Sequence, residues 1–263
     1  MSRFFAFIYG VICYGIFFAT QLYLIGFLGN FLVPMSIDSG VSSATGTALL
    51  VNIGLIALFG FQHSVMARPG FKAWWTNLVP KSVERSTYVL FASLSLILLY
   101  WQWRTMGQVI WQVDAAWLQT VLWGVFFAGF VLVLLSTFII DHFDHFDLFG
   151  LRQVTLNLLQ REYADPEFKV VSLYKFVRHP LYVGLLLAFW GTPTMTLGHL
   201  VFAIGMSAYI LIGVRHEERD LVQILGEDYA KYQERIPMLI PRPGKVHETV
   251  KAGSTGKAPS SMR

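Results

Sequence analysis

Charged side chains are scarce in this sequence. Asp, Glu, Lys and Arg make up only 14% of its 263 residues, whereas about 25% is usual for soluble domains. Hydrophobic residues account for 55%, the mean hydropathy is +0.53, and the apolar residues fall in long blocks. This shortage of charge excludes an ordinary soluble domain and predicts a polytopic membrane protein.

Cysteine is almost absent as well. The single one, Cys13, lies inside an apolar run, which excludes a disulfide framework and a cysteine-based metal site. The seven histidines are scattered rather than grouped in boxes, so no metal site is expected. The pI of about 9.2 does not indicate a nucleic-acid partner, because the basic residues are spread through the loops instead of forming one stripe.

The apolar runs predict about six transmembrane helices for a ~30 Å hydrocarbon layer. Gly191, Pro193 and Gly198 lie at or near the turn between the last two, which are short and therefore predict a tight helical hairpin. An amphipathic helix is expected after the hairpin. The predicted fold class is an all-α integral membrane protein with spans at residues 4–31, 47–65, 84–103, 117–140, 181–195 and 197–214.

The basic residues predict the orientation of these spans. With both termini, the loops at 66–83 and 141–179, and everything after residue 214 on one side, every Lys and Arg except Arg104 lies on that side. The positive-inside rule makes it the cytoplasmic face. The expected organisation is a four-helix N-terminal region (1–140), a region with the hairpin (141–242), and a disordered polar tail (243–263).

A charged turn opens the hairpin, with the sequence Arg178-His179-Pro180-Leu181-Tyr182-Val183-Gly184. Proline at a first helical turn starts a helix, and the free N–H groups there favour an anion. The Glu217-Glu218 pair follows at the exit of the last span, and a tight hairpin brings both ends to one face. A plain helix start and a solvated surface pair remain the simpler interpretations.

Two further polar groups lie at span ends. Asp141 and His145, or His142 and His145, share a helix face if the fourth span continues, and such a pair suits proton transfer, a metal or a polar cap. His63, in Gln62-His63-Ser64 at the end of the second span, is either functional or a satisfied interfacial residue.

Four elements in order resemble the isoprenylcysteine carboxyl methyltransferase superfamily, whose members are membrane enzymes that use S-adenosylmethionine. They are the RHPxYxG turn, Glu217-Glu218-x-x-Leu221, Gly226-x-x-Tyr229-x-x-Tyr232 and Ile236-Pro237-x-x-Ile240-Pro241. The resemblance implies a cofactor-binding region at 141–242. The cofactor-binding residues that it implies are Arg178, His179, Pro180, Leu181, Tyr182, Gly184, Glu217, Glu218 and Tyr229.

The upstream segment QHSVMARPGFKAWWTNLVPKSVERSTYVL, followed by WQWR, is similar to the bacterial methanethiol S-methyltransferases, which share this part with NnrU-type membrane proteins. The resemblance implies methylation of methanethiol, a small volatile thiol, to dimethyl sulfide at the cytoplasmic face of a bacterial inner membrane. Trp74 and Trp75 are expected to close the pocket around so small a substrate.

Methyl transfer to sulfur requires the thiolate, so a base or a positive field is needed at neutral pH. Asp141, His142 and His145 are the first candidates for the base, and His63 is the next candidate. Arg178 and Arg85 are candidates for the positive potential.

Three alternatives stay open at the level of sequence. A methyltransferase for another thiol, a selenol or a lipid would keep the cofactor motif. A membrane reductase would bind a nicotinamide instead. A non-enzymatic NnrU-like protein would need neither, with His63 as a haem-ligand or structural candidate. The sequence carries no signal for the oligomeric state.

Overall fold

A computed structural model describes residues 2–138, 145–164, 170 and 172–241. The fold is almost entirely helical. The long helices are α1 (Arg3–Gly29), α2 (Thr45–Ala67), α4 (Lys81–Gln102), α5 (Ala116–Phe138) and α9 (Leu197–Leu225). The short ones are α3 (Pro69–Trp75), α6 (His145–Leu148), α7 (Leu151–Leu158), η1 (Ser172–Lys175), α8 (Pro180–Trp190) and α10 (Glu227–Arg235). Within the described ranges there are also four short strands: β1 (Val41–Ser42), β2 (Arg104–Thr105), β3 (Val109–Gln112) and β4 (Thr194–Thr196).

The predicted membrane spans are confirmed in their main features. Among the described residues, five helices are long and apolar enough to cross a membrane. The sixth expected span is α8, whose 11 residues cover only about half of a ~30 Å layer at ~1.5 Å per residue. The expected amphipathic helix is present as α10. The predicted disordered tail lies outside the described residues.

The last long helix extends further than the sequence pattern predicted. It begins at Leu197 as expected but ends at Leu225 instead of near residue 214. The charged residues after 214 are good helix formers, and the helix ends only where Gly226 adopts a positive φ of 62°. Glu217 and Glu218 therefore lie on a rigid extension of the membrane helix, where their positions are fixed.

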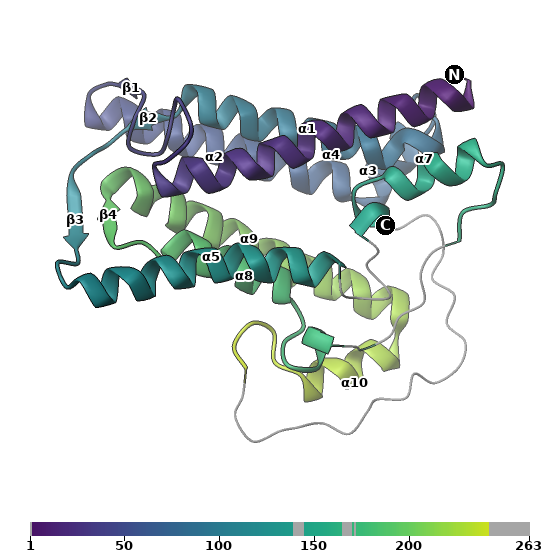
Figure 1. The fold of residues 1–263 in the computed structure, drawn as a ribbon. Helices are drawn as coiled ribbons and strands as arrows, with labels where there is room; N and C mark the ends of the chain where they lie inside the picture. The colour runs from purple at the N-terminus through teal and green to yellow at the C-terminus, as the bar shows by residue number, and fades with distance from the viewer. Residues whose placement is uncertain (1, 139–144, 165–169, 171, 242–263) are drawn as a thin grey trace.

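The helices form two layers (Figure 1). One layer contains α1, α2 and α4, and the other contains α5, α8 and α9, with α2 packed against α9 between them. Large aromatic side chains fill the core where the layers meet. The buried ones include Phe27, Trp103, Phe126, Phe189 and Phe202. Apolar side chains elsewhere on the long helices are exposed, as lipid-facing surfaces require.

The hairpin helix α8 is held against α5 by two glycines. A Cβ atom added to Gly129 would lie 2.5 Å from the carbonyl oxygen of Gly184, and one added to Gly184 would lie 2.6 Å from that of Gly129. Such close backbone approach is how small residues pack membrane helices. Gly184, which the resemblance assigned to cofactor binding, thus has a packing role in this structure.

The two ends of the bundle differ in character (Figure 1). One end carries the strands: β1 pairs with β2 in parallel, and β3 pairs with β4 antiparallel. Asn52 fixes β2 there, because its side chain bonds the carbonyl (2.8 Å) and amide (2.9 Å) of Arg104. The other end carries the N-terminus, α3, α7 and α10. The polar motifs lie at that second end, and Arg104 lies opposite.

Candidate active site

The centre of the polar end is a buried ion-pair cluster. Arg178 and His179 come directly before α8, which Pro180 begins as predicted, and Glu218 projects from the extension of α9. Arg178 Nε lies 2.5 Å from Glu218 Oε1, and His179 Nε2 lies 3.1 Å from the same oxygen. The three side chains are only 6–13% exposed. The hairpin thus brings its two charged ends together, as the sequence predicted.

The segment after α10 closes this cluster from the other side. Arg178 Nη1 donates to the carbonyl of Gln233 at 2.8 Å and also to that of Ile236. The Arg178 amide donates to Pro237 O at 2.9 Å, and Gln233 Nε2 donates to Glu218 Oε2 at 3.3 Å. The Ile236-Pro237 element therefore supplies the backbone acceptors that a buried guanidinium needs. We call Arg178, His179, Glu218 and Gln233 the ion-pair cluster.

Helix α10 is anchored to the bundle by two buried tyrosines. Tyr229 and Tyr232 pack together with Ile236, and Tyr232 donates to the carbonyl of Tyr174 at 2.7 Å. Burial raises the pKa of the Tyr229 hydroxyl above its ordinary value, so this hydroxyl stays neutral at physiological pH. Tyr229 acts in this structure as part of the wall that holds α10 in place.

A second polar group lies on α2, α4, α8 and α9. Tyr88 Oη lies 2.9 Å from His63 Nε2, and the Arg85 guanidinium lies 5.7 Å from the Tyr88 ring. Tyr182 donates to Glu217 Oε2 at 3.1 Å. Glu217 is also close enough to act electrostatically on Tyr88 and on Tyr209 of α9. The upstream motif and the hairpin motif therefore meet around Glu217.

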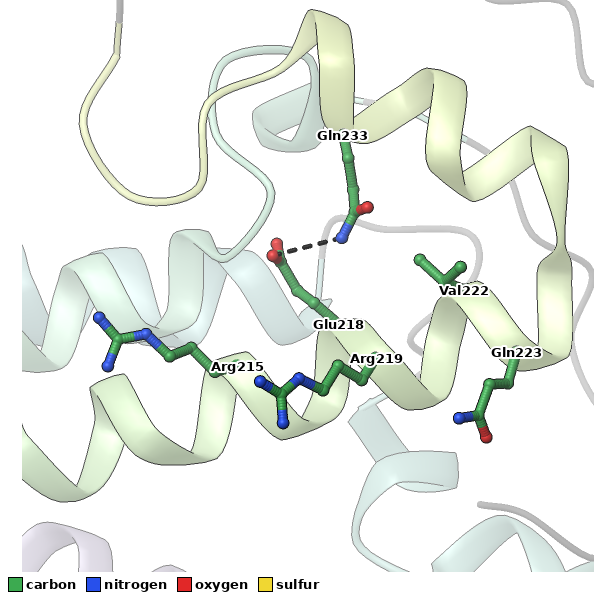
Figure 2. A pocket seen from close by; sticks show the side chains of 6 residues that line it. All are labelled: Arg215, Glu218, Arg219, Val222, Gln223 and Gln233. Carbon is green, nitrogen blue, oxygen red and sulfur yellow. Dashed lines mark hydrogen bonds between the residues drawn. The ribbon is translucent and has the colours of Figure 1, made fainter.

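A pocket of about 480 Å³ opens between α9 and α10 beside the ion-pair cluster (Figure 2). Glu218 and Gln233 border it, with the dashed bond between them, while Arg215 and Arg219 contribute two guanidinium groups from α9. Its remaining lining residues are Val222 and Gln223. Cationic and anionic side chains in one pocket suit a zwitterionic ligand such as the amino-acid end of a cofactor.

His145 lies in a different environment from these two groups. Its Nε2 lies 2.7 Å from the hydroxyl of Tyr14 on α1, and its Nδ1 lies 3.1 Å from Thr137 on α5. Its ring stacks on Phe138 at 3.9 Å. These contacts give His145 a role in joining α1, α5 and α6. Asp141 and His142, the other predicted members of this group, lie outside the described residues.

The remaining predicted site residues support the turn, and three further residues of the polar groups were not predicted. Leu181 is half-buried in the first turn of α8, and Pro180 starts that helix, so both support the Arg178-His179 turn. Gln233, Tyr88 and Tyr209 were not singled out from the sequence, although all three take part in the polar groups. Tyr88 belonged to a quoted motif, but nothing in the spacing of Gln233 or Tyr209 indicated a shared site.

Comparison with known proteins shows the family of the chain. The family model described as NnrU protein matches residues 51–242, most of the chain. The chain belongs to the NnrU family. The matched part of this NnrU-family protein runs from α2 through α10 and includes both polar groups.

Curated relatives narrow the family further. The NnrU-family protein is 54% identical to methanethiol S-methyltransferase 1 of Bradyrhizobium diazoefficiens over 91% of this chain and 83% of that protein. It is 52% identical to the methanethiol S-methyltransferase of Crocosphaera subtropica over 93% and 95% of the two chains. Nurim of Sus scrofa is 31% identical over 65% and 66%. No solved structure matches the chain. The protein is thus also a member of the methanethiol S-methyltransferase family.

Proposed function

We propose that this protein methylates methanethiol to dimethyl sulfide, with S-adenosylmethionine as the methyl donor. The names of relatives that are about half identical over nearly the whole chain support the reaction. The structural observation that carries the proposal is the meeting of two motif groups around Glu217 and Glu218. One group, on α8 and α9, suits the donor, and the other, on α2 and α4, suits the acceptor.

The residues at the polar end fit S-adenosylmethionine in charge and size. The pocket between α9 and α10 lies within the ~300–1,000 Å³ range of small-molecule sites. Arg215 and Arg219 would face the carboxylate, and Glu218 the ammonium or ribose hydroxyls. The rings of Tyr182 and Tyr209 near Glu217 suit a sulfonium cation. When bound, the cofactor supplies an activated methyl group.

The ion-pair cluster would orient the donor site. Glu218 already bonds Arg178, His179 and Gln233, so its carboxylate is held in one direction. Fixed charges in a dry site stabilise charge more strongly than mobile ones in water. Alignment of donor and acceptor alone can contribute about 7–11 kcal/mol to such a reaction. The chain's main task is therefore positioning.

The polar end would face the cytoplasm of a bacterial inner membrane. Among the described residues, the elements and loops that carry the motifs and the basic residues other than Arg104 lie at this end (Figure 1), which agrees with the positive-inside rule. S-adenosylmethionine is a cytoplasmic metabolite, whereas methanethiol is small and uncharged enough to arrive through the lipid.

The test uses the purified protein in lipid nanodiscs with methanethiol and S-adenosylmethionine that carries a deuterated methyl group. Headspace mass spectrometry should detect dimethyl sulfide with one deuterated methyl. Calorimetry should detect binding of S-adenosylhomocysteine, weakened by His179→Ala and unchanged by His216→Ala, which removes an exposed histidine nearby on α9. Folded protein that binds a nicotinamide cofactor and no S-adenosylhomocysteine would overturn the proposal.

A further inference from the structure

Unpartnered buried polar atoms gather at one place in this structure. Among the described residues, five buried side-chain nitrogen or oxygen atoms have no hydrogen-bond partner. Three of them are Gln62 Oε1, His63 Nδ1 and Trp75 Nε1. A buried polar atom without a partner costs about 1–3 kcal/mol, and native proteins keep few of them. Three in one neighbourhood point to a site that a ligand completes.

These three residues surround one apolar cluster. We define the Met66 cluster as Met66, Tyr88 and Val89 with the side chains packed on them, Phe17, Phe71, Trp75 and Phe149. Trp75 belongs to it directly. Gln62 reaches it through a bond from Nε2 to Met66 Sδ at 3.1 Å, and His63 through Tyr88. Trp74, by contrast, is 55% exposed, so only Trp75 of the pair can close a pocket.

His63 is the one residue here that can act as a base. Tyr88 Oη lies 2.9 Å from His63 Nε2 and 3.4 Å from the His63 carbonyl oxygen. If the Tyr88 hydroxyl donates to the carbonyl, Nε2–H donates to Tyr88. Nδ1 then keeps a lone pair that no protein group uses. Phe59 and Tyr209 enclose the ring, with centroids 5.4 and 6.1 Å away.

We propose that the Met66 cluster binds the acceptor thiol and that His63 Nδ1 removes its proton, with Tyr88 as the positioning residue that sets the imidazole tautomer. This inference rests on the proposed function and adds the acceptor site and the base to it. The site takes a small alkyl thiol, because its walls from Met66, Phe71 and Trp75 are apolar.

The chemical step balances within the site. The thiol S–H bond breaks, and its proton goes to His63 Nδ1. The sulfur lone pair forms the new S–CH₃ bond. The bond between that methyl carbon and the donor sulfonium breaks, and its electron pair stays on the donor sulfur, which leaves as a neutral thioether. Arg85, over the Tyr88 ring, favours the thiolate. The proton then leaves to water.

The acceptor site lies next to the proposed donor site. Tyr209 links the two sites, because its ring packs on His63 and Glu217 of the same helix acts on it electrostatically. Glu217 acts electrostatically on Tyr88 and bonds Tyr182 of the RHPxYxG turn. The sulfur held at His63 would therefore face a methyl group held by α8 and α9.

The test compares a thiol with a selenol in the His63→Gln variant. Glutamine places its amide near the Nε2 position, so the bond to Tyr88 is kept, but nothing replaces Nδ1. Methaneselenol is ionised at neutral pH and needs no base. With methanethiol, kcat/KM should fall by about 10²–10⁴-fold, whereas with methaneselenol it should change by less than about tenfold. His216→Gln, the same substitution at an exposed histidine, should change kcat/KM for neither substrate.

A structural defect would lower both reactions alike, so equal losses with thiol and selenol would overturn the assignment, as would an unchanged rate with methanethiol. Tyr88→Phe supplies a second variant if His63→Gln does not fold, and it should also slow the thiol more than the selenol. Both variants should bind S-adenosylhomocysteine as the wild type does. Failure of the wild type itself to make dimethyl sulfide would count against the proposed function instead.

Discussion

The ion-pair cluster and the polar residues around the Met66 cluster lie at the same end of one membrane bundle, yet their bonding is opposite. Arg178 and Glu218 bond each other. Arg178 also donates to the carbonyls of Gln233 and Ile236, and Glu218 also bonds the side chains of His179 and Gln233. Around the Met66 cluster, one side-chain atom each of Gln62, His63 and Trp75 is buried without a hydrogen-bond partner. A network whose hydrogen bonds are all satisfied holds its side chains in one arrangement, whereas atoms without partners can bond a ligand.

The contrast also explains why the two regions come from different parts of the chain. Glu218 is set by the hairpin, which is held against α5 through Gly129 and Gly184. The acceptor group instead comes from α2 and α4, which the other layer carries. The proposed donor and acceptor sites thus belong to two layers that meet where α2 packs against α9.

The largest expected effect is loss of one partner from the closed network. Arg178→Ala leaves the Glu218 carboxylate buried without its guanidinium, and breaking a buried pair in this way costs about 3–5 kcal/mol. Thermal unfolding in detergent should show a large drop. The double variant Arg178→Met with Glu218→Leu should recover much of the stability but no S-adenosylhomocysteine binding. Recovery of binding in the double variant would show that the cluster serves only the fold.

A smaller effect should follow from separating α8 from α5. Gly184→Ala would place a methyl group within about 3 Å of the Gly129 carbonyl, and overpacking of this kind costs about 1–3 kcal/mol. The matched variant is Gly124→Ala on α5, where a Cβ meets no atom within 4 Å. Unfolding midpoints should fall for the first variant and stay level or rise for the second. Equal midpoints would contradict the close helix contact.

The smallest effect is expected for Tyr182→Phe. This change removes one hydrogen bond to Glu217, worth about 1 kcal/mol. Steady-state kinetics should show KM for S-adenosylmethionine rising by about fivefold, with KM for methanethiol unchanged. A rise in KM for methanethiol alone would place Tyr182 in the acceptor site and contradict the proposed division between the two groups.

Much of the fold could be predicted from the sequence because long apolar runs and basic loops constrain a membrane protein strongly. The hairpin was predicted from Gly191, Pro193 and Gly198. In the structure the short strand β4 lies in the turn between α8 and α9. The length of α9 could not be predicted, since hydropathy falls at residue 214 while helix propensity does not. The packing role of Gly184 was hidden because its partner, Gly129, belongs to another helix.

The candidate site was predicted in part. The meeting of Arg178 and Glu218, 40 residues apart, followed from the geometry of a hairpin. The sequence predicted Glu218 as a ligand contact or a solvated surface residue, but three side chains of the protein already bond it. The sequence ranked His145 above His63 as a candidate base because several charged residues lie close to it along the chain. In the structure its two ring nitrogens contact Tyr14 and Thr137. Only the structure reveals which nitrogen lacks a partner.

One comparison tests the division between donor and acceptor sites most directly. Glu218→Gln and His63→Gln, prepared in the same nanodiscs, would be measured for S-adenosylhomocysteine affinity by calorimetry and for dimethyl sulfide formation from methanethiol. The account predicts that Glu218→Gln loses both affinity and product, while His63→Gln keeps the affinity and loses the product. Loss of S-adenosylhomocysteine affinity in His63→Gln as large as that in Glu218→Gln would contradict it.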